Sequence, residues 1–420
     1  MMNLAIYDAF AAANGSDVNK TFYKYGLDFV NTTTDETAEV AAIHGAYTVL
    51  SQLYSDQQAS LDSFYASSIS GYSAGAITSG VQLGAQIGNT IVAKRANDGW
   101  NADVSYTYVD AIGSFQPDPL NPDVPVWGPG WGQVDPFMIT STDAHFPSAM
   151  PAIDSAEYAA SYNEVKQLGS VDSMARTADQ TEAGLFWAYD VEGMGTPLTL
   201  YNNVLTTVAQ QEGNTAAENA ALFAQASVAM ADAGIVAWDS KFEYELWRPV
   251  TAIHDGDIDG NPLTEGDASW TALGAPDGEG DVIGFTPQFP TYVSGHATFG
   301  GAVFGTLMEF YGTDDISFEL TSEELVLLLA DPQLQAEYGL ALTDATRSFD
   351  SFSEAMAENG RSRVYLGIHF DFDDLIGQEV GQDVASYVTS GNFVAVPAPA
   401  TAAIALGGFP LMMRRHRRIT

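Results

Sequence analysis

Residues 241–249, 293–296 and 362–373 are three separated blocks whose side chains could together bind a tetrahedral oxyanion. The cations in these blocks are Lys241, Arg248 and Arg363. A phosphate-shaped anion spreads its charge over several oxygens, so a dry site needs cations and N–H donors that converge from different directions. Ser294 adds a hydroxyl and Gly295 a backbone N–H that no Cβ keeps at a distance. The blocks therefore predict an oxyanion cage.

Two imidazoles accompany the predicted cage. His296 follows the Ser-Gly pair directly, and His369 lies six residues after Arg363. Histidine can act both as a ligand and as a proton donor, so the two can divide these roles. Asp373 lies four residues after His369, one turn later if this stretch is helical, and could fix the imidazole tautomer through its second nitrogen.

Each block has an ordinary structural explanation when it is taken alone. A Ser-Gly-His triplet often caps a helix with a surface histidine, and an Arg-Pro pair often stands at a helix boundary. Chance produces any one of these patterns easily. Only the three together, in this order and with their internal spacing intact, favour a functional site.

At these residues the chain resembles the type 2 phosphatidic acid phosphatase superfamily, and within it the bacterial branch of the vanadium-dependent haloperoxidases. The resemblance spans about residues 1–390. Val293 stands where many relatives have Pro, and His254 stands where an Arg is common, which leaves the pocket mouth in doubt. The similar stretches are 1–11, 131–137 (WGQVDPF), 162–166 (YNEVK), 176–181 (RTADQT), 238–241 (WDSK), 247–253 (WRPVTAI) and 289–301 (FPTYVSGHATFGG).

The resemblance implies an all-α fold of two helical-bundle halves with a few short strands in loops. It implies vanadate bound to His369, a site that phosphate also fits, with His296 as acid/base and Lys241 polarising bound peroxide. Hydrogen peroxide and a halide, or a small organic acceptor, would be the substrates. Phe289 fills a position thought to bear on halide choice, although a core aromatic explains it equally well. The residues implied to hold the vanadate oxygens are Lys241, Arg248, Ser294, Gly295 and Arg363.

An acid phosphatase could use the same cage. In that alternative His369 attacks phosphorus to give a phosphohistidine, His296 protonates the leaving alcohol, and Asp373 orients the nucleophile. Vanadate and phosphate have nearly the same shape, so the cage residues alone do not separate the two activities. The long soluble N-terminal half is unlike the compact lipid phosphatases and favours the peroxidase.

The composition is strongly acidic. There are 54 Asp and Glu against 15 Lys and Arg, for a formal charge of -39, which makes nucleic acid an improbable partner. Such a surface suits a saline or extracellular setting, or simply a soluble acidic protein. With no Cys, thiol chemistry and disulfides are excluded, and a redox role would need a bound cofactor.

Helical periodicity dominates the chain. We expect helices over 155–168, from a capping box at Thr215 to Trp238, from Ser294 to Phe310, and over 322–338 and 374–390. Residues 1–11 should form an amphipathic helix that contains Asp8. Residues 100–135, rich in Pro, Gly and Trp, should form an ordered irregular excursion with a short strand pair. The expected units are an N-terminal helical half (1–210), the active-site bundle (211–392) and a tail (393–420).

Two further segments invite specific interpretations. Residues 255–260 (DGDIDG) resemble the start of a calcium loop, but Gly266 stands at the twelfth position instead of Glu and Pro262 interrupts the loop, so an acidic surface loop is favoured. The tail resembles a PEP-CTERM sorting signal: VPAPAT at 396–401, an apolar stretch to 413, and the basic RRHRR at 414–418. This implies export to the cell envelope or beyond, with exosortase-type processing. No N-terminal export signal is visible, so the start is expected to be internal to a longer gene. The oligomeric state stays open.

Overall fold

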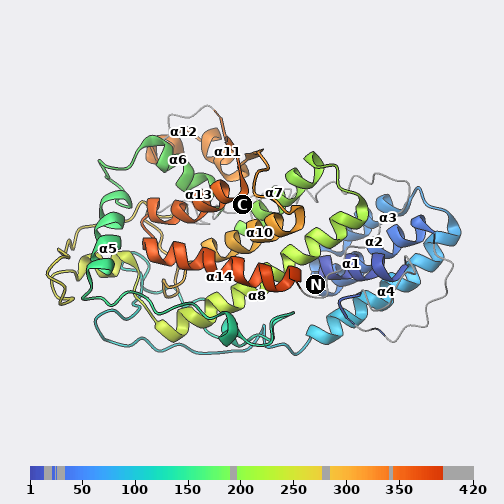
Figure 1. The fold of residues 1–420 in the computed structure, drawn as a ribbon, viewed down its shortest axis with the longest axis horizontal. Helices are drawn as coiled ribbons and strands as arrows, with labels where there is room; N and C mark the ends of the chain where they lie inside the picture. The colour runs from blue at the N-terminus through green and yellow to red at the C-terminus, as the bar shows by residue number, and fades with distance from the viewer. Residues whose placement is uncertain are drawn as a thin grey trace, which may run out of the picture.

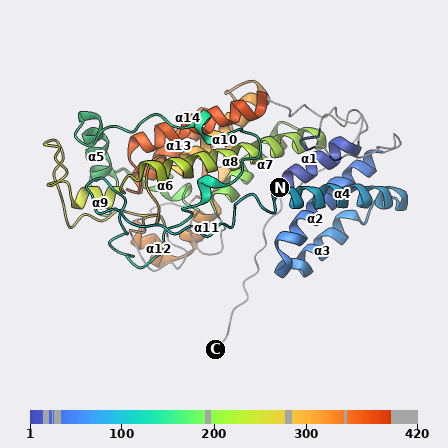
Figure 2. The ribbon, with the colours of Figure 1, turned by 90° about the horizontal axis from the view of Figure 1, so that it is seen from below.

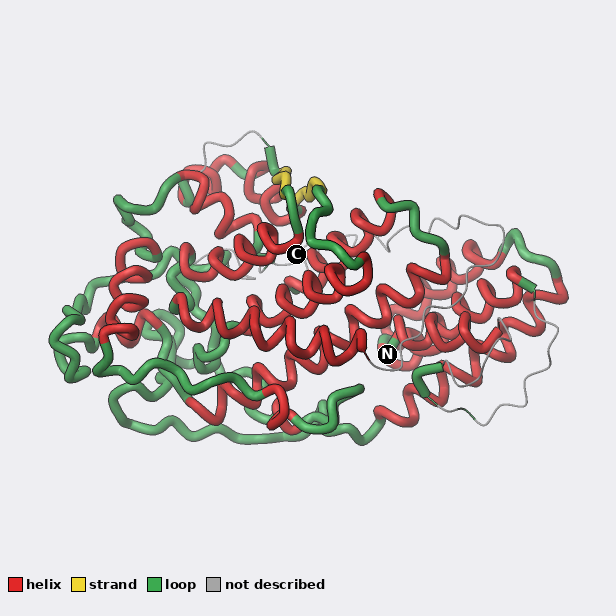
Figure 3. Tube along the Cα trace, viewed as in Figure 1, coloured by secondary structure: helices red, strands yellow, loops and turns green. Residues whose placement is uncertain are grey.

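The computed structural model describes residues 1–13, 21–23, 25, 34–189, 196–276, 284–339 and 344–390. These residues are mostly helical, which confirms the expected all-α class (Figure 3). The α-helices are α1 (Met2–Ala13), α2 (Asp35–Leu53), α3 (Gln58–Ile69), α4 (Ala74–Arg95), α5 (Ala156–Leu168), α6 (Ala178–Phe186), α7 (Pro197–Gln211), α8 (Ala216–Tyr244), α9 (Pro249–His254), α10 (Gly295–Tyr311), α11 (Glu323–Ala330), α12 (Pro332–Glu337), α13 (Phe352–Tyr365) and α14 (Asp371–Ser390). The 3-10 helices are η2 (Ser55–Gln57), η3 (Trp131–Gln133) and η4 (Thr142–His145), and the antiparallel strands are β1 (Phe318–Thr321) and β2 (Thr346–Phe349).

Helices α8, α10, α13 and α14 form the central bundle, in which α10 contacts the other three (Figure 1). Glycines allow α10 and α14 to approach at backbone distance. A Cβ added at Gly301 would lie 2.4 Å from the carbonyl oxygen of Gln378, and one at Gly381 would lie 2.2 Å from that of Thr298. This close contact brings the first residues of α10 beside the first turn of α14, where the backbone N–H of Ser294 donates to the carbonyl of Asp373 at 3.0 Å.

Helices α1–α4 form a second group at the opposite end of the molecule from α5 (Figures 1 and 2). Helix α1 contacts α2, α4 and α8, so it joins this group to the central bundle. The predicted helix is present, but none of its residues is exposed, so it has no polar face toward solvent. Asp8 is fully buried, and its carboxylate accepts the N–H groups of Phe22 and Tyr23 and the hydroxyl of Tyr25.

Residues 100–135 form the expected ordered and irregular segment, but the strand pair predicted there is absent from it. Its backbone pairing consists of one isolated antiparallel bridge, from Ser114 to Leu246, of turns, and of single hydrogen bonds such as the one from the N–H of Trp127 to the carbonyl of Gln288. Residues 131–133 form η3, which contacts α8. The Pro and Gly residues interrupt regular pairing, so the segment is held by contacts with α8 and with the loop that follows it.

Several helix boundaries agree with the sequence. Thr215 and Glu218 make the predicted capping box, and Ser294 caps α10. The single helix predicted over 322–338 is instead two helices, α11 and α12. Pro332 cannot continue a helix, and the Asp331 side chain accepts the N–H groups of Gln333 and Leu334 to start a new one.

Helix α8 is long and apolar enough to cross a membrane, but 83% of its most apolar window is buried inside the protein. It lies in the core of the central bundle, where it contacts α10 and α14, and it also contacts α1 and α7. Burial by neighbouring helices explains its composition.

Candidate active site

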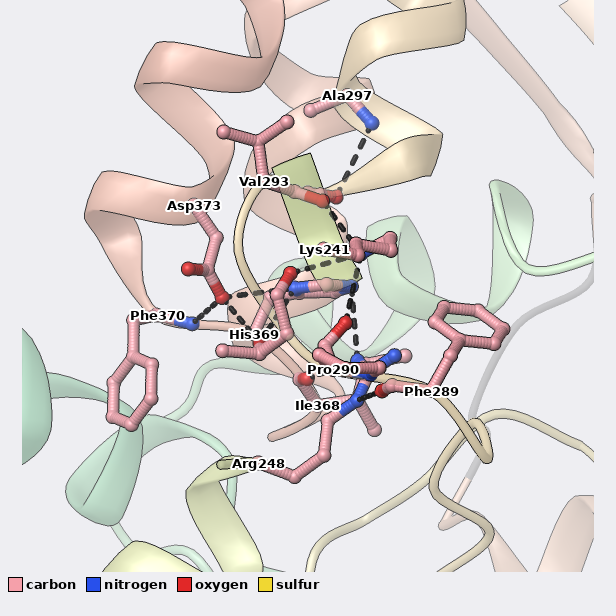
Figure 4. Close-up of polar contacts among 12 residues, drawn as sticks. Lys241, Arg248, Phe289, Pro290, Val293, Ala297, Ile368, His369, Phe370 and Asp373 are labelled. Atoms are coloured by element: carbon pink, nitrogen blue, oxygen red, sulfur yellow. Dashed lines mark hydrogen bonds and ion pairs between the residues drawn. The ribbon is translucent and has the colours of Figure 1, made fainter. Parts of the chain in front are cut away.

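The predicted cage residues come from the ends of helices and from the loops between them, and Figure 4 shows Lys241, Arg248, His369 and Asp373 among them. Lys241 lies in the last turn of α8, and Arg248 is the residue before α9. Arg363 lies in the last turn of α13, His369 in the turn between α13 and α14, and Asp373 in the first turn of α14. Helix packing therefore brings together blocks that are far apart in the sequence.

Lys241 is fully buried. Its Nζ donates to the backbone carbonyls of Pro290, Thr291 and Val293 at 3.0, 2.9 and 2.6 Å. The ammonium thus connects the end of α8 to the loop that leads into α10. Its positive charge also contributes to lowering the pKa of His369. Burial, reinforced by Arg248, holds the pKa of Lys241 well below its ordinary value, against the opposing charge of Asp373.

Arg248 presents its guanidinium to the same loop and to His369. Its Nε donates to the carbonyl of Phe289 at 2.8 Å, and its Nη1 donates to the carbonyl of Ile368 at 2.8 Å and to His369 Nε2 at 3.0 Å. The remaining nitrogen, Nη2, is buried and has no hydrogen-bond partner among the described residues. Burial lowers the pKa of Arg248 to about 9, so it still carries its charge at neutral pH.

His369 makes the predicted contact with Asp373, because its Nδ1 lies 2.9 Å from Asp373 Oδ2. The predicted helical turn between the two residues is only partly present, since α14 begins at Asp371 and His369 precedes it. Asp373 Oδ2 also accepts the N–H of Phe370 at 3.0 Å. The Asp373 carboxylate, in the first turn of α14, therefore fixes the imidazole of His369, which lies just before this helix.

Ser294, Gly295 and His296 open α10, as predicted. The Ser294 Oγ accepts the N–H of Ala297 at 3.3 Å, which leaves its hydroxyl proton for another acceptor. The N-terminal end of a helix carries a partial positive charge and free N–H groups, which favours an anion there. The carbonyl of His296 accepts the hydroxyl of Tyr201 at 2.9 Å, while its Nε2 is buried without a partner in the described part of the chain.

Arg363 lies at the same site on the α13 side. It is buried, its Nε donates to the Ser362 hydroxyl at 3.1 Å, and its Nη2 reaches the carbonyl of Gly184 at 3.4 Å. Its charge contributes to lowering the pKa of both His296 and His369.

Both histidines are held in the neutral form. Burial is the main cause that lowers the pKa of His369 well below its ordinary value, followed by the charges of Arg248, Lys241 and Arg363. Burial and then Arg363 lower the pKa of His296 in the same direction. Burial raises the pKa of Asp373 to about 6, although the Thr291 hydroxyl opposes the shift. At neutral pH the site therefore combines neutral imidazoles with an ionised carboxylate.

Phe289 covers two of the cations. Its ring lies 5.0 Å from Lys241 Nζ and 4.7 Å from the guanidinium carbon of Arg248. Trp238 packs against Phe289 with ring centroids 5.1 Å apart, and Trp127, which is 44% exposed, lies on its other side at 6.1 Å. Phe289, Trp238 and Trp127 thus form an aromatic layer, in which Phe289 lies between the buried cations Lys241 and Arg248 and the partly exposed Trp127.

The donor set fits a tetrahedral oxyanion such as vanadate better than a metal cation. Buried N–H donors normally have partners, and the unpartnered Arg248 Nη2 and His296 Nε2 are buried polar atoms that a ligand oxygen could satisfy. Within the described residues, no group of three or more His, Cys, Asp or Glu side chains could hold a metal ion. Two arginines, a lysine and a helix N-terminus match an anion with several oxygens.

Two of the three carboxylates in the acidic segment 255–260 accept hydrogen bonds from the residues that follow it. Asp259 accepts the Thr264 hydroxyl and the N–H of Asn261, and Asp257 accepts the N–H of Gly266. Asp257 is exposed but Asp259 is buried, so the segment is only partly the expected surface loop.

Comparisons with known proteins agree with this geometry. Residues 221–393, which include every predicted cage residue, match the family model described as the VCPO second helical-bundle domain. This segment is therefore similar to that domain. The chain is 35% identical over 306 residues to the vanadium chloroperoxidase of Curvularia inaequalis, an alignment that covers 63% of this chain and 49% of that relative. The chain therefore spans about half the length of the curated relative that it matches.

The fold of almost the whole chain is shared with solved structures. The first bacterial vanadium-dependent iodoperoxidase superposes with a TM-score of 0.70 and 24% identity, covering 95% of this chain and 91% of that one. A holo-type bacterial vanadium-dependent chloroperoxidase superposes with a TM-score of 0.67 and 15% identity, covering 93% and 90%. At these identities the likeness establishes the fold of the chain, in which residues 221–393 join the N-terminal helices.

Sequence reasoning missed one polar residue of the bundle. Thr291 is fully buried, and its side chain contacts both His369 and Asp373. The available signal was its place two residues before the block 293–296, within the stretch 289–301 that carries the resemblance. A threonine there has an ordinary explanation as a loop residue, so the sequence alone did not distinguish it.

Proposed function

We propose that this protein is a vanadate-dependent haloperoxidase, which oxidises a halide with hydrogen peroxide and a proton to hypohalous acid and water. The observation that carries the proposal is the buried cluster of Lys241, Arg248 and neutral His369 beside the N-terminus of α10. The match of residues 221–393 to the VCPO second helical-bundle domain and the similarity of the chain to vanadium chloroperoxidase favour this activity over other uses of an oxyanion cage.

His369 would hold the vanadium through Nε2, because Nδ1 already faces Asp373. The oxygens of the anion would be bound by the guanidinium groups of Arg248 and Arg363, the Ser294 hydroxyl and the N–H of Gly295. Lys241 supplies a third positive charge, and in this position it favours the accumulation of negative charge on the peroxide. Bound vanadate supplies an electrophilic centre that activates hydrogen peroxide toward halide.

His296 is the residue placed to move protons. Burial and Arg363 keep its imidazole neutral, so Nε2 can accept a proton from hydrogen peroxide and return one to the departing oxygen. Tyr201 and Asn359 fix the backbone of this residue through its carbonyl, at 2.9 and 3.3 Å. The aromatic layer around Phe289 limits the entry of water, which strengthens the electrostatic contacts inside the site.

Two assays on the purified protein test the proposal. Halide oxidation is measured with added vanadate and hydrogen peroxide, and phosphate release is measured from a generic phosphate ester without vanadate. We expect oxidation of at least one of iodide, bromide and chloride that depends on vanadate. Phosphate release without any vanadate-dependent oxidation would establish the acid phosphatase instead.

We also propose that the protein is exported and that its tail is processed. The support is the pattern at 393–420, which lies outside the described residues. Fractionation of the native cells combined with mass spectrometry of the mature protein tests this. Recovery of full-length protein only from the cytoplasmic fraction would contradict it.

A further inference from the structure

We infer that Thr291 is a positioning residue that fixes His369 with its proton on Nδ1 and its lone pair on Nε2. Thr291 Oγ1 donates to Asp373 Oδ2 at 2.5 Å and lies 3.0 Å from His369 Nδ1. His369 Nδ1 is also 2.9 Å from Asp373 Oδ2. The three side chains form a closed triangle, and all three are buried.

The proton count of this triangle determines the tautomer. The Thr291 hydroxyl has one proton, which it donates to the carboxylate, so its oxygen can only accept from His369. Asp373 Oδ2 also accepts the N–H of Phe370, so this oxygen acts as an acceptor in the triangle. His369 Nδ1 must therefore be the donor, because a bare Nδ1 would turn its lone pair toward two oxygen atoms.

The other end of the ring supports the same assignment independently. His369 Nε2 lies 3.0 Å from Arg248 Nη1. A guanidinium has only donors, so Nε2 of a neutral imidazole must accept there. Both nitrogens thus agree that the lone pair is on Nε2, the atom that faces the cage.

Thr291 is itself held firmly by its backbone. Its N–H donates to the carbonyl of Leu246 at 3.0 Å, and its carbonyl accepts Lys241 Nζ at 2.9 Å. A β-branched side chain on a fixed backbone has few rotamers, so the hydroxyl is held in place. One residue therefore links the position of Lys241 to the orientation of His369.

The effect of Thr291 on vanadate binding rests on the proposed function. The tautomer assignment does not. An imidazole that binds a metal centre through Nε2 needs its lone pair there, and partners that fix the other nitrogen typically change metal affinity by roughly 10–100-fold. Thr291 shares this task with Asp373. Without its hydroxyl, the carboxylate loses its shortest contact and the ring loses one of its two Nδ1 partners.

The first experiment reads the tautomer directly and needs no vanadate. In the full-length protein with ¹⁵N-labelled histidine, long-range ¹H–¹⁵N correlation spectra distinguish a protonated Nδ1 from a protonated Nε2 at neutral pH. The His369 signal is assigned by its loss in His369→Ala. We expect the proton on Nδ1 in the wild type and in Thr291→Ser. In Thr291→Val we expect only a small fraction protonated on Nε2, because Arg248 and Asp373 still favour the Nδ1 proton. A wild-type ring protonated on Nε2 would overturn the inference.

The second experiment measures the dissociation constant of vanadate by equilibrium dialysis. Thr291→Val removes the hydroxyl with nearly the same shape, and Thr291→Ser restores it. We expect the constant to rise about tenfold or more in Thr291→Val and to stay within about threefold of the wild type in Thr291→Ser. Equal affinity in both variants, with the tautomer unchanged, would reject the positioning role while the proposed function stands.

A wild-type protein that binds no vanadate would instead reject the proposed function. The tautomer measurement would then decide the inference alone. Thermal unfolding of each variant separates a positioning role from a structural one. A loss of stability in Thr291→Val that leaves both the tautomer and the affinity unchanged would make Thr291 a structural residue only.

Discussion

Arg248 Nη1 lies 3.0 Å from His369 Nε2 and 2.8 Å from the carbonyl of Ile368. The guanidinium that contributes charge to the cage therefore also occupies the lone pair that would bind vanadium. When an oxyanion binds, this hydrogen bond must be exchanged for a bond to the central atom, and Nη1 must turn to an anion oxygen. The affinity for the anion thus depends on Arg248 keeping its contacts with the carbonyls of Phe289 and Ile368 while Nη1 changes its partner from His369 to the anion.

Replacing Arg248 by Lys should weaken anion binding strongly. Arg248 contacts Phe289 through Nε and Ile368 through Nη1, and Nη2 remains for the anion. A lysine keeps the charge but has one nitrogen, so it cannot make all these contacts at once. We expect the dissociation constant of vanadate to rise roughly tenfold or more, since a hydrogen bond to a charged group contributes about 1.5–3 kcal/mol.

A matched control for this prediction is Arg347→Lys. Arg347 pairs with Asp179, Glu182 and Glu358 outside the cage. This variant should lose some thermal stability and bind vanadate as the wild type does. Equal vanadate affinity in Arg248→Lys and Arg347→Lys would show that Arg248 is not part of the anion site.

His369→Ala should abolish vanadate binding, because no other described imidazole has its Nε2 against Arg248. The vacated space would also leave Asp373 without its imidazole partner, so some loss of stability is expected. Equilibrium dialysis measures the binding. The control is His44→Ala on α2, where the imidazole contacts only the Tyr65 hydroxyl among its hydrogen-bond partners and lies far from the bundle site. Retained stoichiometric binding in His369→Ala would refute the assignment of the ligand.

Much of this site could be predicted from the sequence because its residues form local patterns with helix signals beside them. Ser294 begins a helix and the capping box at Thr215 begins another, so the positions of α10 and α8 followed from short-range chemistry. The break at Pro332 had the same kind of signal but was overlooked. These features depend on residues only a few positions apart.

The contacts that depend on long-range packing were not predictable in the same way. The three carbonyls that receive Lys241 belong to a loop about 50 residues further along the chain. The contacts of α1 with α2, α4 and α8 bury its polar Asp8, and the amphipathic pattern alone did not indicate this burial. Thr291 likewise contacts His369 and Asp373 only because the packing of α13 and α14 brings these two residues next to it.

Asp374 should make stability depend on pH. It is fully buried, its Oδ1 accepts Gln378 Nε2 at 2.6 Å, and its Oδ2 has no hydrogen-bond partner among the described residues. Burial raises its pKa to about 7. The folded state therefore keeps a proton that the unfolded chain, with a pKa of about 3.9, releases earlier. The stability contribution is complete below about pH 4 and is lost as the pH rises through about 7.

Asp374→Asn removes this dependence while keeping the contact to Gln378. We expect the melting temperature of the variant, relative to the wild type, to increase between pH 5 and pH 8. Differential scanning calorimetry at several pH values measures it. The control is Asp154→Asn, which changes an exposed carboxylate and measures the effect of removing one surface charge. A difference that is constant or decreasing in Asp374→Asn would show that this carboxyl is ionised without cost.

Phe289 offers a test of whether the aromatic layer selects the halide or only fills space. Its ring lies within 5.0 Å of Lys241 Nζ and 4.7 Å of the Arg248 guanidinium carbon, so Phe289→Ala should admit water and screen both charges. We expect kcat/KM for halide oxidation to fall several-fold, and Phe289→Leu, which keeps an apolar cover, to fall less. The measurement compares chloride, bromide and iodide under the same conditions.

The pattern across the three halides separates the two explanations of this residue. A space-filling side chain affects the cage as a whole, so all three rates should fall in the same proportion in Phe289→Ala. A side chain that contacts the halide should change the ratios, because the ions differ in size and in the strength of their hydration. We expect the ratios to change, since the ring covers the cations directly. Proportional losses in both variants would assign Phe289 to the core alone.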